Sequence, residues 1–322
     1  LFNIVQKKRD CLYFETASFI FLIQKKETIQ VEQNMKIAIA SGKGGTGKTF
    51  ISTNLFHTLQ LQGENVTLVD CDAEEPNASA FIKGKLLESY PVIQLVPVID
   101  ETKCTYCGKC FEYCNYNAIF FLEERKIIKV TEELCHGCGA CSFVCSYDAI
   151  SEKEDTLGEI NRFGVSSHSE LVEARMKVGV YSPVSILKEA IKAAGDAPIV
   201  LMDSPPGTSC PFIQTVDKAD FVVLVTEPTP FGLSDLRQSV EVLKTMNKPF
   251  GVIINRADMG GEGVYQYLHK ENITHLMSIP FKRDIAAVYS KGELLCEEQP
   301  SWQQSFSSLF NQIKDLYGDS CH

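Results

Sequence analysis

The stretch "IAIASGKGGTGKTFIS" spans residues 37–52 and joins a short apolar run to a segment that reads as a helix. Gly42, then four residues, then Gly47, Lys48 and Thr49 fit a phosphate-binding loop between a strand and a helix. In such a loop, backbone N–H groups converge on phosphate oxygens and the helix amino terminus adds partial positive charge. We therefore expect a nucleotide here, with Lys48 at its terminal phosphates and Thr49 binding Mg²⁺.

Apolar runs with polar carboxyl ends flank this loop and recur along the chain. "MKIAIAS" precedes the loop, "TFISTNLFHTLQLQG" reads as a helix ended by Gly63, and "NVTLVDCD" reads as the next strand. Further strands are expected in "APIVLMDSPPG" (197–207), "DFVVLVTEP" (220–228) and "FGVIINR" (250–256), with helices around 184–194, 232–247, 262–272 and 301–317. This order predicts an α/β fold with a doubly wound, mostly parallel sheet.

Two cysteine-rich segments interrupt that pattern. "CTYCGKCFEYCNYNAI" begins at Cys104 and "CHGCGACSFVCSYDAI" begins at Cys135, so the repeat has a 31-residue period. Structural zinc usually takes two separated pairs of ligands, and cysteines this close are poorly placed for orderly disulfides; both remain alternatives. The spacing is that of bacterial two-cluster ferredoxins.

These patterns predict four parts. Residues 35–99 and 156–322 would form the two parts of the P-loop domain, and 100–155 an inserted, small α+β ferredoxin-like domain. Residues 1–34 are expected to be an upstream extension or the product of a mis-set start codon, because Met35 begins a clean strand.

Composition narrows the class of protein. The 322-residue chain has 44% hydrophobic and 22% charged residues, which is an ordinary globular balance. Its net charge of −10 argues against broad nucleic-acid binding. The longest early apolar run, "FIFLI" (19–23), is too short for a membrane anchor. Eight of the 13 cysteines in two tight runs indicate a reducing, cytoplasmic compartment.

The loop itself carries an extra lysine, Lys43. "KGGTGKT" resembles the deviant Walker A motif of the MinD/ParA/Mrp-like, SIMIBI-class P-loop ATPases, which include the nitrogenase iron protein and the Mrp iron–sulfur carriers. In that family this lysine crosses a dimer interface to the partner's nucleotide. The resemblance thus implies that Lys43 acts in catalysis within a homodimer, or a heterodimer with a paralogue, formed on ATP binding. The alternative is a solvated loop lysine.

The resemblance also assigns roles to residues beyond the loop. Asp72 stands where the family aspartate orients the attacking water, and Asp203 of "DSPPG" where the Walker B-like acid meets Mg²⁺. Gly207 would contact the γ-phosphate and Asn255 of "INR" the adenine. Asp70 is a second candidate acid, or simply caps a helix. Within the loop, nucleotide contacts are expected from Gly42, Gly44, Gly45, Thr46, Gly47, Lys48 and Thr49.

The ferredoxin resemblance implies a crossed set of ligands, because there the fourth cysteine of each run serves the other cluster. One 4Fe–4S cluster would be held by Cys104, Cys107, Cys110 and Cys145, and the other by Cys135, Cys138, Cys141 and Cys114. Asn115 and Ser146 replace the proline that usually follows the fourth cysteine, so a shifted cluster potential is expected. His136 lies inside the second run but is not needed as a ligand.

Cys210 lies seven residues after Asp203. The nitrogenase iron protein has a cluster-binding cysteine at the corresponding distance, so Cys210 is either a metal bridge between subunits or a small packing residue.

Three functions fit these features. The first is an ATPase that gates electron transfer to a redox partner, with ATP/ADP, Mg²⁺ and two 4Fe–4S clusters as cofactors. The second is an assembly or carrier ATPase for iron–sulfur clusters or other metallocofactors. The third is a MinD-like positioning ATPase, which the weakly amphipathic chain end, lacking a basic face, disfavours.

Overall fold

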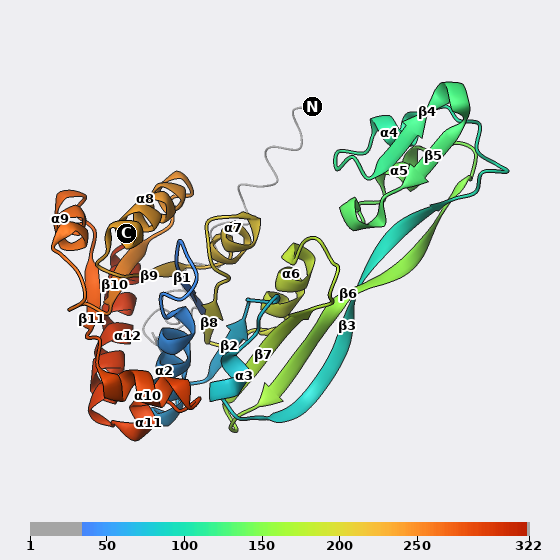
Figure 1. Cartoon of the computed structure of the whole chain (residues 1–322). Coiled ribbons are helices and arrows are strands. Elements are labelled where there is room, and N and C mark those ends of the chain that lie inside the picture. Colours follow the sequence, from blue (N-terminus) through green and yellow to red (C-terminus); the bar gives the residue numbers. More distant parts are fainter. Residues whose placement is uncertain (1–33, 321–322) are drawn as a thin grey trace, which may run out of the picture. The chain divides into compact units, whose positions relative to one another are not determined.

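The computed structural model describes residues 34–320 (Figure 1). The predicted extension at residues 1–34 therefore lies, apart from Asn34, outside the described residues. Within the described range, no helix is long and apolar enough to cross a membrane.

The strand–loop–helix–strand unit around the phosphate loop is confirmed. β1 (Met35–Ala40) leads into the loop, α2 (Lys48–Leu61) follows it, and β2 (Val66–Asp70) comes next. Both strands are almost entirely buried, as expected for apolar runs covered on two faces. Gly63 follows α2 with a left-handed φ of 80°, the conformation that glycine adopts most easily after a helix.

A nine-stranded sheet forms the framework. Its order is β11-β10-β9-β1-β8-β2-β7-β6-β3, and the seven strands from β11 to β7 are parallel. The further strands are β3 (Lys85–Ile99), β6 (Ile150–Gly164), β7 (Ser169–Met176), β8 (Ile199–Asp203), β9 (Phe221–Thr226), β10 (Phe250–Asn255) and β11 (His275–Ile279). β1 lies between β8 and β9, so the phosphate loop leaves the centre of the sheet at its carboxyl edge.

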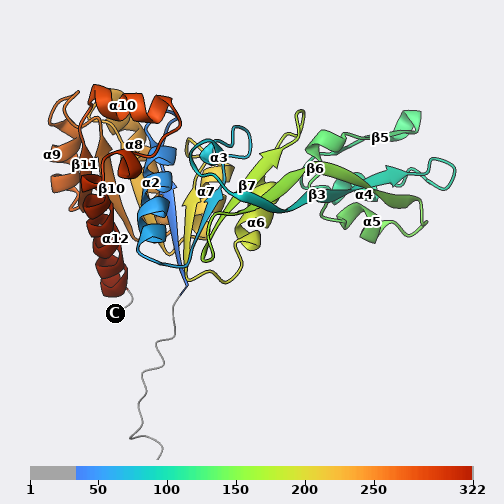
Figure 2. The ribbon, with the colours of Figure 1, turned by 90° about the horizontal axis from the view of Figure 1, so that it is seen from below.

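Helices cover both faces of the sheet, which confirms the doubly wound α/β fold. On one face lie α2, α10 (Arg283–Ser290), α11 (Leu295–Glu298) and α12 (Ser301–Ser320). On the other lie α6 (Val184–Ala193), α7 (Cys210–Asp217), α8 (Pro230–Thr245) and α9 (Gly263–Lys270). Along β1, Ile37 and Ile39 join the first core, while Ala38 and Ala40 join the second. Figure 2 shows α12 beside α2.

The cysteine-rich segment is enclosed by two long strands. β3 and β6 pair in antiparallel register from Lys85 opposite Gly164 to Ile99 opposite Ile150, so residues 100–149 emerge from one end of this ribbon. This segment contains α4 (Lys109–Glu112), β4 (Ile119–Leu122), β5 (Ile127–Val130), α5 (Ala140–Val144) and the 3₁₀ turns η2 (Glu123–Arg125) and η3 (Glu132–Leu134). β6 begins at Ile150, inside the 100–155 range expected for the insert. Before β3, the short α3 (Ala78–Phe81) follows β2.

Most predicted elements are confirmed within a few residues, including those at β8, β9, β10, α6, α8, α9 and α12. The sequence did not reveal the β3–β6 ribbon, β7, α7, β11, α10 or α11.

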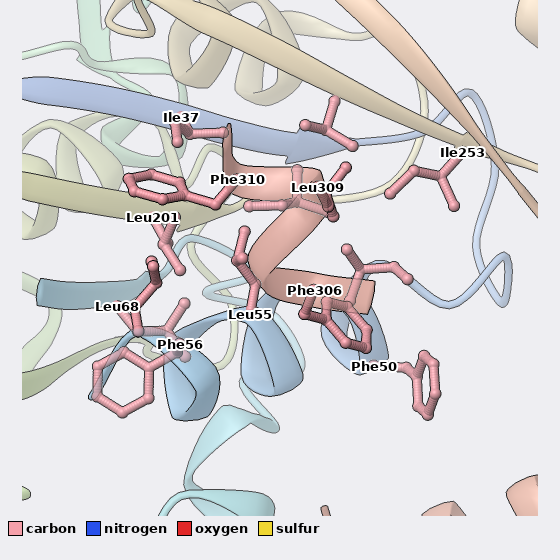
Figure 3. Close-up of a cluster of buried hydrophobic side chains, with 14 of the residues drawn as sticks. Ile37, Phe50, Leu55, Phe56, Leu68, Leu201, Ile253, Phe306, Leu309 and Phe310 are labelled. Atoms are coloured by element: carbon pink, nitrogen blue, oxygen red, sulfur yellow. The ribbon is translucent and has the colours of Figure 1, made fainter. Parts of the chain in front are cut away.

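The packing of α12 against α2 supports the phosphate loop, because α2 begins at the loop. A substitution in this contact tests that support. Phe306 of α12 is fully buried beside Leu55 and Phe50 of α2 (Figure 3). We expect Phe306→Ala to lower the free energy of unfolding by about 3–5 kcal/mol, since it removes a large buried ring and leaves a cavity. Urea denaturation measures this.

The matched control is Leu61→Ala, at the exposed end of α2, where we expect a change below about 0.5 kcal/mol. Equal effects of the two substitutions would contradict the packing of α12 on α2.

Candidate functional site

The phosphate loop has the backbone conformation that its glycines permit. Gly47 has a left-handed φ of 100° and its carbonyl accepts the first hydrogen bond of α2, from Ile51 N. The Asn255 amide donates to Thr46 O at 2.8 Å, and a Cβ on Gly47 would overlap Asn255 Nδ2. The end of β10 therefore lies directly against the loop, and a side chain at Gly47 would displace the Asn255 amide and strain the left-handed backbone.

Lys48 is buried among three carboxylates. Its side chain is 7% exposed, and burial lowers the pKa of its ammonium, while Asp203, Asp72 and Asp70 oppose that shift. Burial also raises the pKa of Asp72, with Lys48 opposing the shift. The site therefore holds one buried cation facing more acidic groups than it can neutralise.

Asp203 ends β8 and is fully buried. Among the described residues, neither of its carboxylate oxygens has a hydrogen-bond partner of good geometry. Burial raises its pKa to about 6, although the nearby Thr49 and Ser52 hydroxyls and Lys48 lower it. A buried carboxylate without partners next to a loop hydroxyl suits Mg²⁺, which prefers hard oxygen ligands and retains waters. Thr49 and Asp203 would hold the ion, whose role is to neutralise phosphate charge.

Asp70, unlike Asp203, is bonded to the backbone of the loop that follows it. Its carboxylate accepts backbone N–H bonds from Asp72 at 3.1 Å and from Asn77 and Ala78 at 2.8 Å each, so it fixes the loop after β2. Burial, followed by repulsion from Asp203, raises its pKa to about 8. The capping alternative for Asp70 thus agrees with its contacts, and Asp72 is left half-buried near Lys48.

An apolar hollow of about 290 Å³ opens beside the loop. It is lined by Gly45, Gly47, Phe50, Asn255, Arg256, Pro280, Phe281, Lys282, Ile285, Ala286 and Tyr289. Asn255 is on this wall, as expected for a residue near a base, but its amide is engaged with the loop. The sequence did not predict Phe281 and Tyr289, because the segment after β11 carries no motif, nor Arg256, which follows Asn255 at the end of β10.

The other candidate residues of the nucleotide site lie in the phosphate loop or are bonded to it. Lys43 Nζ is 3.2 Å from Glu227 Oε2, a partner that the sequence did not predict. Gly207 N donates to Ser41 O at 3.1 Å, so the segment after β8 is bonded to the loop. Gly42 packs against the Asp235 backbone, and Gly44 lies near Pro206.

The eight clustered cysteines surround two separate hollows. Cys104, Cys107, Cys110 and Cys145 line one of them. Cys114, Cys135, Cys138 and Cys141 line the other. Each hollow thus receives three cysteines from one run and one from the other run.

The donors around these hollows suit an iron–sulfur cluster better than a single metal ion. No three His, Cys, Asp or Glu side chains within residues 34–320 approach closely enough to hold a single metal ion. A 4Fe–4S cluster differs because each cysteine binds its own iron, so the ligands stand farther apart. Backbone N–H groups donate to three of the sulfurs: Tyr106 N to Cys104 Sγ at 3.4 Å, Ala118 N to Cys114 Sγ at 3.3 Å and Gly137 N to Cys135 Sγ at 3.4 Å. Such N–H···S contacts suit cluster sulfurs, and the residues fit the group.

Burial raises the pKa of several of these thiols, Cys110 to about 11 and those of Cys135 and Cys141 in the same direction. Because iron binds thiolates, a cluster in these hollows would replace protons.

Cys210 is exposed at the start of α7 and lines neither hollow. His136 stacks on Tyr116 with ring centroids 3.9 Å apart, and both rings line the hollow of Cys114, Cys135, Cys138 and Cys141.

The fold and the loop define a nucleotide-binding α/β protein. The chain belongs to the family described as the CobQ/CobB/MinD/ParA nucleotide binding domain, whose model matches residues 37–295.

Similar proteins place the chain within that family. Uncharacterized protein MJ0578 of Methanocaldococcus jannaschii is 32% identical over 286 residues, which cover 88% of this chain and 97% of the relative. The iron-sulfur cluster carrier protein of Pyrococcus horikoshii is 23% identical over 310 residues, which cover 88% of each chain. The septum site-determining protein MinD from the same organism, solved with Mg-ADP, matches with a TM-score of 0.53 at 19% identity and covers 89% of this chain and 98% of that one. That likeness shows the shared fold.

The fit between Gly47 and Asn255 is testable. We expect Gly47→Ala to weaken ADP binding about tenfold or more, because it adds left-handed strain and displaces Asn255. Gly63→Ala is the control, since Gly63 also has positive φ but has open space around it. That variant should lose about 1 kcal/mol of stability and keep its ADP affinity. Isothermal titration measures both, and equal losses of affinity would contradict the geometry.

Proposed function

We propose that this protein is an ATP-hydrolysing, nucleotide-gated dimer that couples ATP turnover to electron transfer through two 4Fe–4S clusters to a protein partner. The observation that carries the proposal is the presence, in one chain, of a P-loop site with an unpartnered Asp203 and of two four-cysteine hollows. The family is described as a nucleotide binding domain, which supports nucleotide binding. Hydrolysis, dimerisation and redox coupling are our proposal.

The roles that we propose for these residues in hydrolysis depend on where negative charge develops on the phosphates. Lys48 and the loop N–H groups would bind the β- and γ-phosphates, and Asp72 would orient the attacking water. Gly207 N would meet the γ-phosphate once released from Ser41 O. Lys43 would come from the second copy and stabilise the charge on the transferring group.

Exposed apolar side chains support docking of a second copy over the nucleotide. Tyr181, Ile213, Phe231 and Met259 are all exposed, and they follow β7, β8, β9 and β10 respectively. The carboxyl ends of these parallel strands lie at one edge of the sheet, which is the edge of the phosphate loop. Apolar side chains grouped around a polar site are typical of an interface.

The cysteine segment supports clusters that stay bound. Its hydrophobic core contains Cys110, Ile119 and Ile128, with three more of the clustered cysteines, Cys104, Cys114 and Cys141, packed against them. A segment this small buries little apolar surface and is commonly stabilised by a metal centre. The bound clusters supply one-electron chemistry. Loss of a cluster would remove part of the segment's own core, which favours a resident redox centre.

The second candidate function is an iron–sulfur cluster carrier or assembly ATPase. The observation that favours it is similarity to proteins named iron-sulfur cluster carrier protein, such as the one from Pyrococcus horikoshii. Incubation with an apo-ferredoxin and ATP separates the two. Retention of iron supports the redox function, whereas ATP-dependent transfer of iron to the acceptor supports the carrier.

Removal of each loop lysine tests the ATPase. Lys48→Ala should abolish turnover and weaken nucleotide binding, because the buried ammonium contacts the phosphates. Lys43→Ala should keep ADP affinity in the single copy but lose dimer formation, with turnover lower by about 10³-fold. Phosphate release and mass photometry with a non-hydrolysable ATP analogue measure these effects. Unchanged dimer formation and turnover in Lys43→Ala would rule out its cross-subunit role.

Iron content tests the crossed cluster ligands. Wild-type protein reconstituted under anaerobic conditions should bind about eight irons per chain. Cys104 and Cys145 line the same hollow although they belong to different runs. The double variant Cys104→Ser, Cys145→Ser should therefore keep about four irons, and Cys210→Ser, outside both hollows, should keep about eight. If the double variant loses nearly all iron, each run binds its own cluster and the pairing is wrong.

A further inference from the structure

Glu227 follows β9 and contacts two cations from different parts of the nucleotide site. Its side chain is only 9% exposed, with Oε2 3.2 Å from Lys43 Nζ and Oε1 2.6 Å from Arg256 Nη1. Lys43 belongs to the phosphate loop, and Arg256 to the wall of the apolar hollow. One nearly buried carboxylate thus connects both halves of the site.

The backbone around Glu227 is fixed independently of Lys43. The Glu227 carbonyl accepts a hydrogen bond from Thr229 N at 2.8 Å, and the Thr229 hydroxyl caps α8 by accepting from Gly232 N at 3.0 Å. Gly232 and Gly260 pack so closely on the carbonyls of Glu227 and Pro228 that a Cβ at either position would overlap them. The backbone of Glu227 therefore keeps its place when Lys43 moves, and the carboxylate still has its contact with Arg256.

Arg256 is also held without help from Lys43. Its N–H donates to Asn255 Oδ1 at 2.9 Å, its backbone has a left-handed φ of 52°, and its guanidinium lies 6.0 Å from the Phe281 ring centroid. The Asn255 amide in turn donates to Thr46 O. A nearly buried carboxylate that loses its only cation is strongly destabilised, whereas Glu227 retains Arg256 after Lys43 leaves.

We propose that Glu227 is a positioning residue that holds Lys43 within its own subunit until a second copy docks, and that Arg256 neutralises Glu227 once Lys43 has crossed. This inference rests on the proposed ATP-dependent dimer. Lys43 is 32% exposed, so its ammonium has a path to solvent and to a partner. Arg256 is 44% exposed, but its backbone is bonded to Asn255 and its guanidinium lies over Phe281, so Lys43 is the cation that can leave.

Removing the acid and removing the arginine should shift the protein concentration needed for dimer formation in opposite directions. Glu227→Gln weakens the hold on Lys43, so dimers should form at about threefold or more lower protein concentration. Arg256→Gln leaves Lys43 as the only counter-ion of Glu227, so dimers should need a concentration higher by a similar factor. Arg256→Lys should restore the wild-type value, because it returns the charge.

Mass photometry of the full chain, reconstituted anaerobically, with Mg²⁺ and a non-hydrolysable ATP analogue, measures the dimer midpoint. Because Arg256 lines the hollow, each variant's ADP affinity is measured first and the analogue is kept saturating. Glu271→Gln is the matched control, since it removes an exposed pair with Lys244 far along the chain and should change nothing. Adding Lys43→Ala to Glu227→Gln should abolish dimer formation as Lys43→Ala does alone, because the gain from Glu227→Gln depends on a released Lys43.

The outcomes separate this inference from the proposed function. A wild-type dimer whose midpoint is unchanged by Glu227→Gln, or weakened alike by Glu227→Gln and Arg256→Gln, overturns the positioning role alone. A wild-type protein that binds nucleotide but remains a single copy overturns the proposed dimer and this role with it.

Discussion

The carboxyl groups of Asp70 and Asp203 are buried at the ends of adjacent strands, opposite each other in the β2–β8 register. Two like charges held this close in a low dielectric are unfavourable unless cations or hydrogen bonds compensate them. Asp70 is compensated by three backbone N–H groups, whereas Asp203 has no hydrogen-bond partner among the described residues. The sheet thus presents one incompletely neutralised acid beside Lys48, and Mg²⁺ with a nucleotide completes the charge balance.

The surrounding fold holds these charged groups close together. β1 lies between β8 and β9, so the loop, Asp203 and Glu227 all come from strands that end at one edge. α2 begins at Lys48 and packs against α12 in the same hydrophobic core. Because the same edge carries the exposed apolar side chains, neutralisation of the site and docking of a second copy would occur on one surface.

The glycine loop, its strands and most helices could be predicted because their signals are local. Loop glycines, apolar runs and the residues after them lie within a few positions of each other. The two long strands around the cysteines could not be read in this way, since β3 carries Pro91 and Pro97 and β6 is mostly charged at its start. Their pairing joins residues that are separated by the whole cysteine segment.

The residues of the candidate site likewise fall into those that a local motif predicts and those that only their contacts in the fold reveal. Lys48, Thr49 and Asp203 stand in recognisable motifs, whereas Asp70 and Asp72 share one motif and differ only in their tertiary contacts. Glu227 looks like any acid after a strand, and only the ion pairs with Lys43 and Arg256 distinguish it. The allocation of Cys145 and Cys114 to opposite hollows likewise depends on how the two runs fold together, for which the ferredoxin resemblance was the only guide.

The most direct test of the central claim is the ADP affinity of the single copy with and without Mg²⁺, in wild type and in Asp203→Asn. If the unpartnered carboxylate completes a Mg²⁺ site, Mg²⁺ tightens ADP binding about tenfold or more in wild type and changes it little in the variant, since a tenfold change corresponds to about 1.4 kcal/mol. Equal Mg²⁺ dependence in the two proteins, or no ADP binding by wild type, would contradict the account.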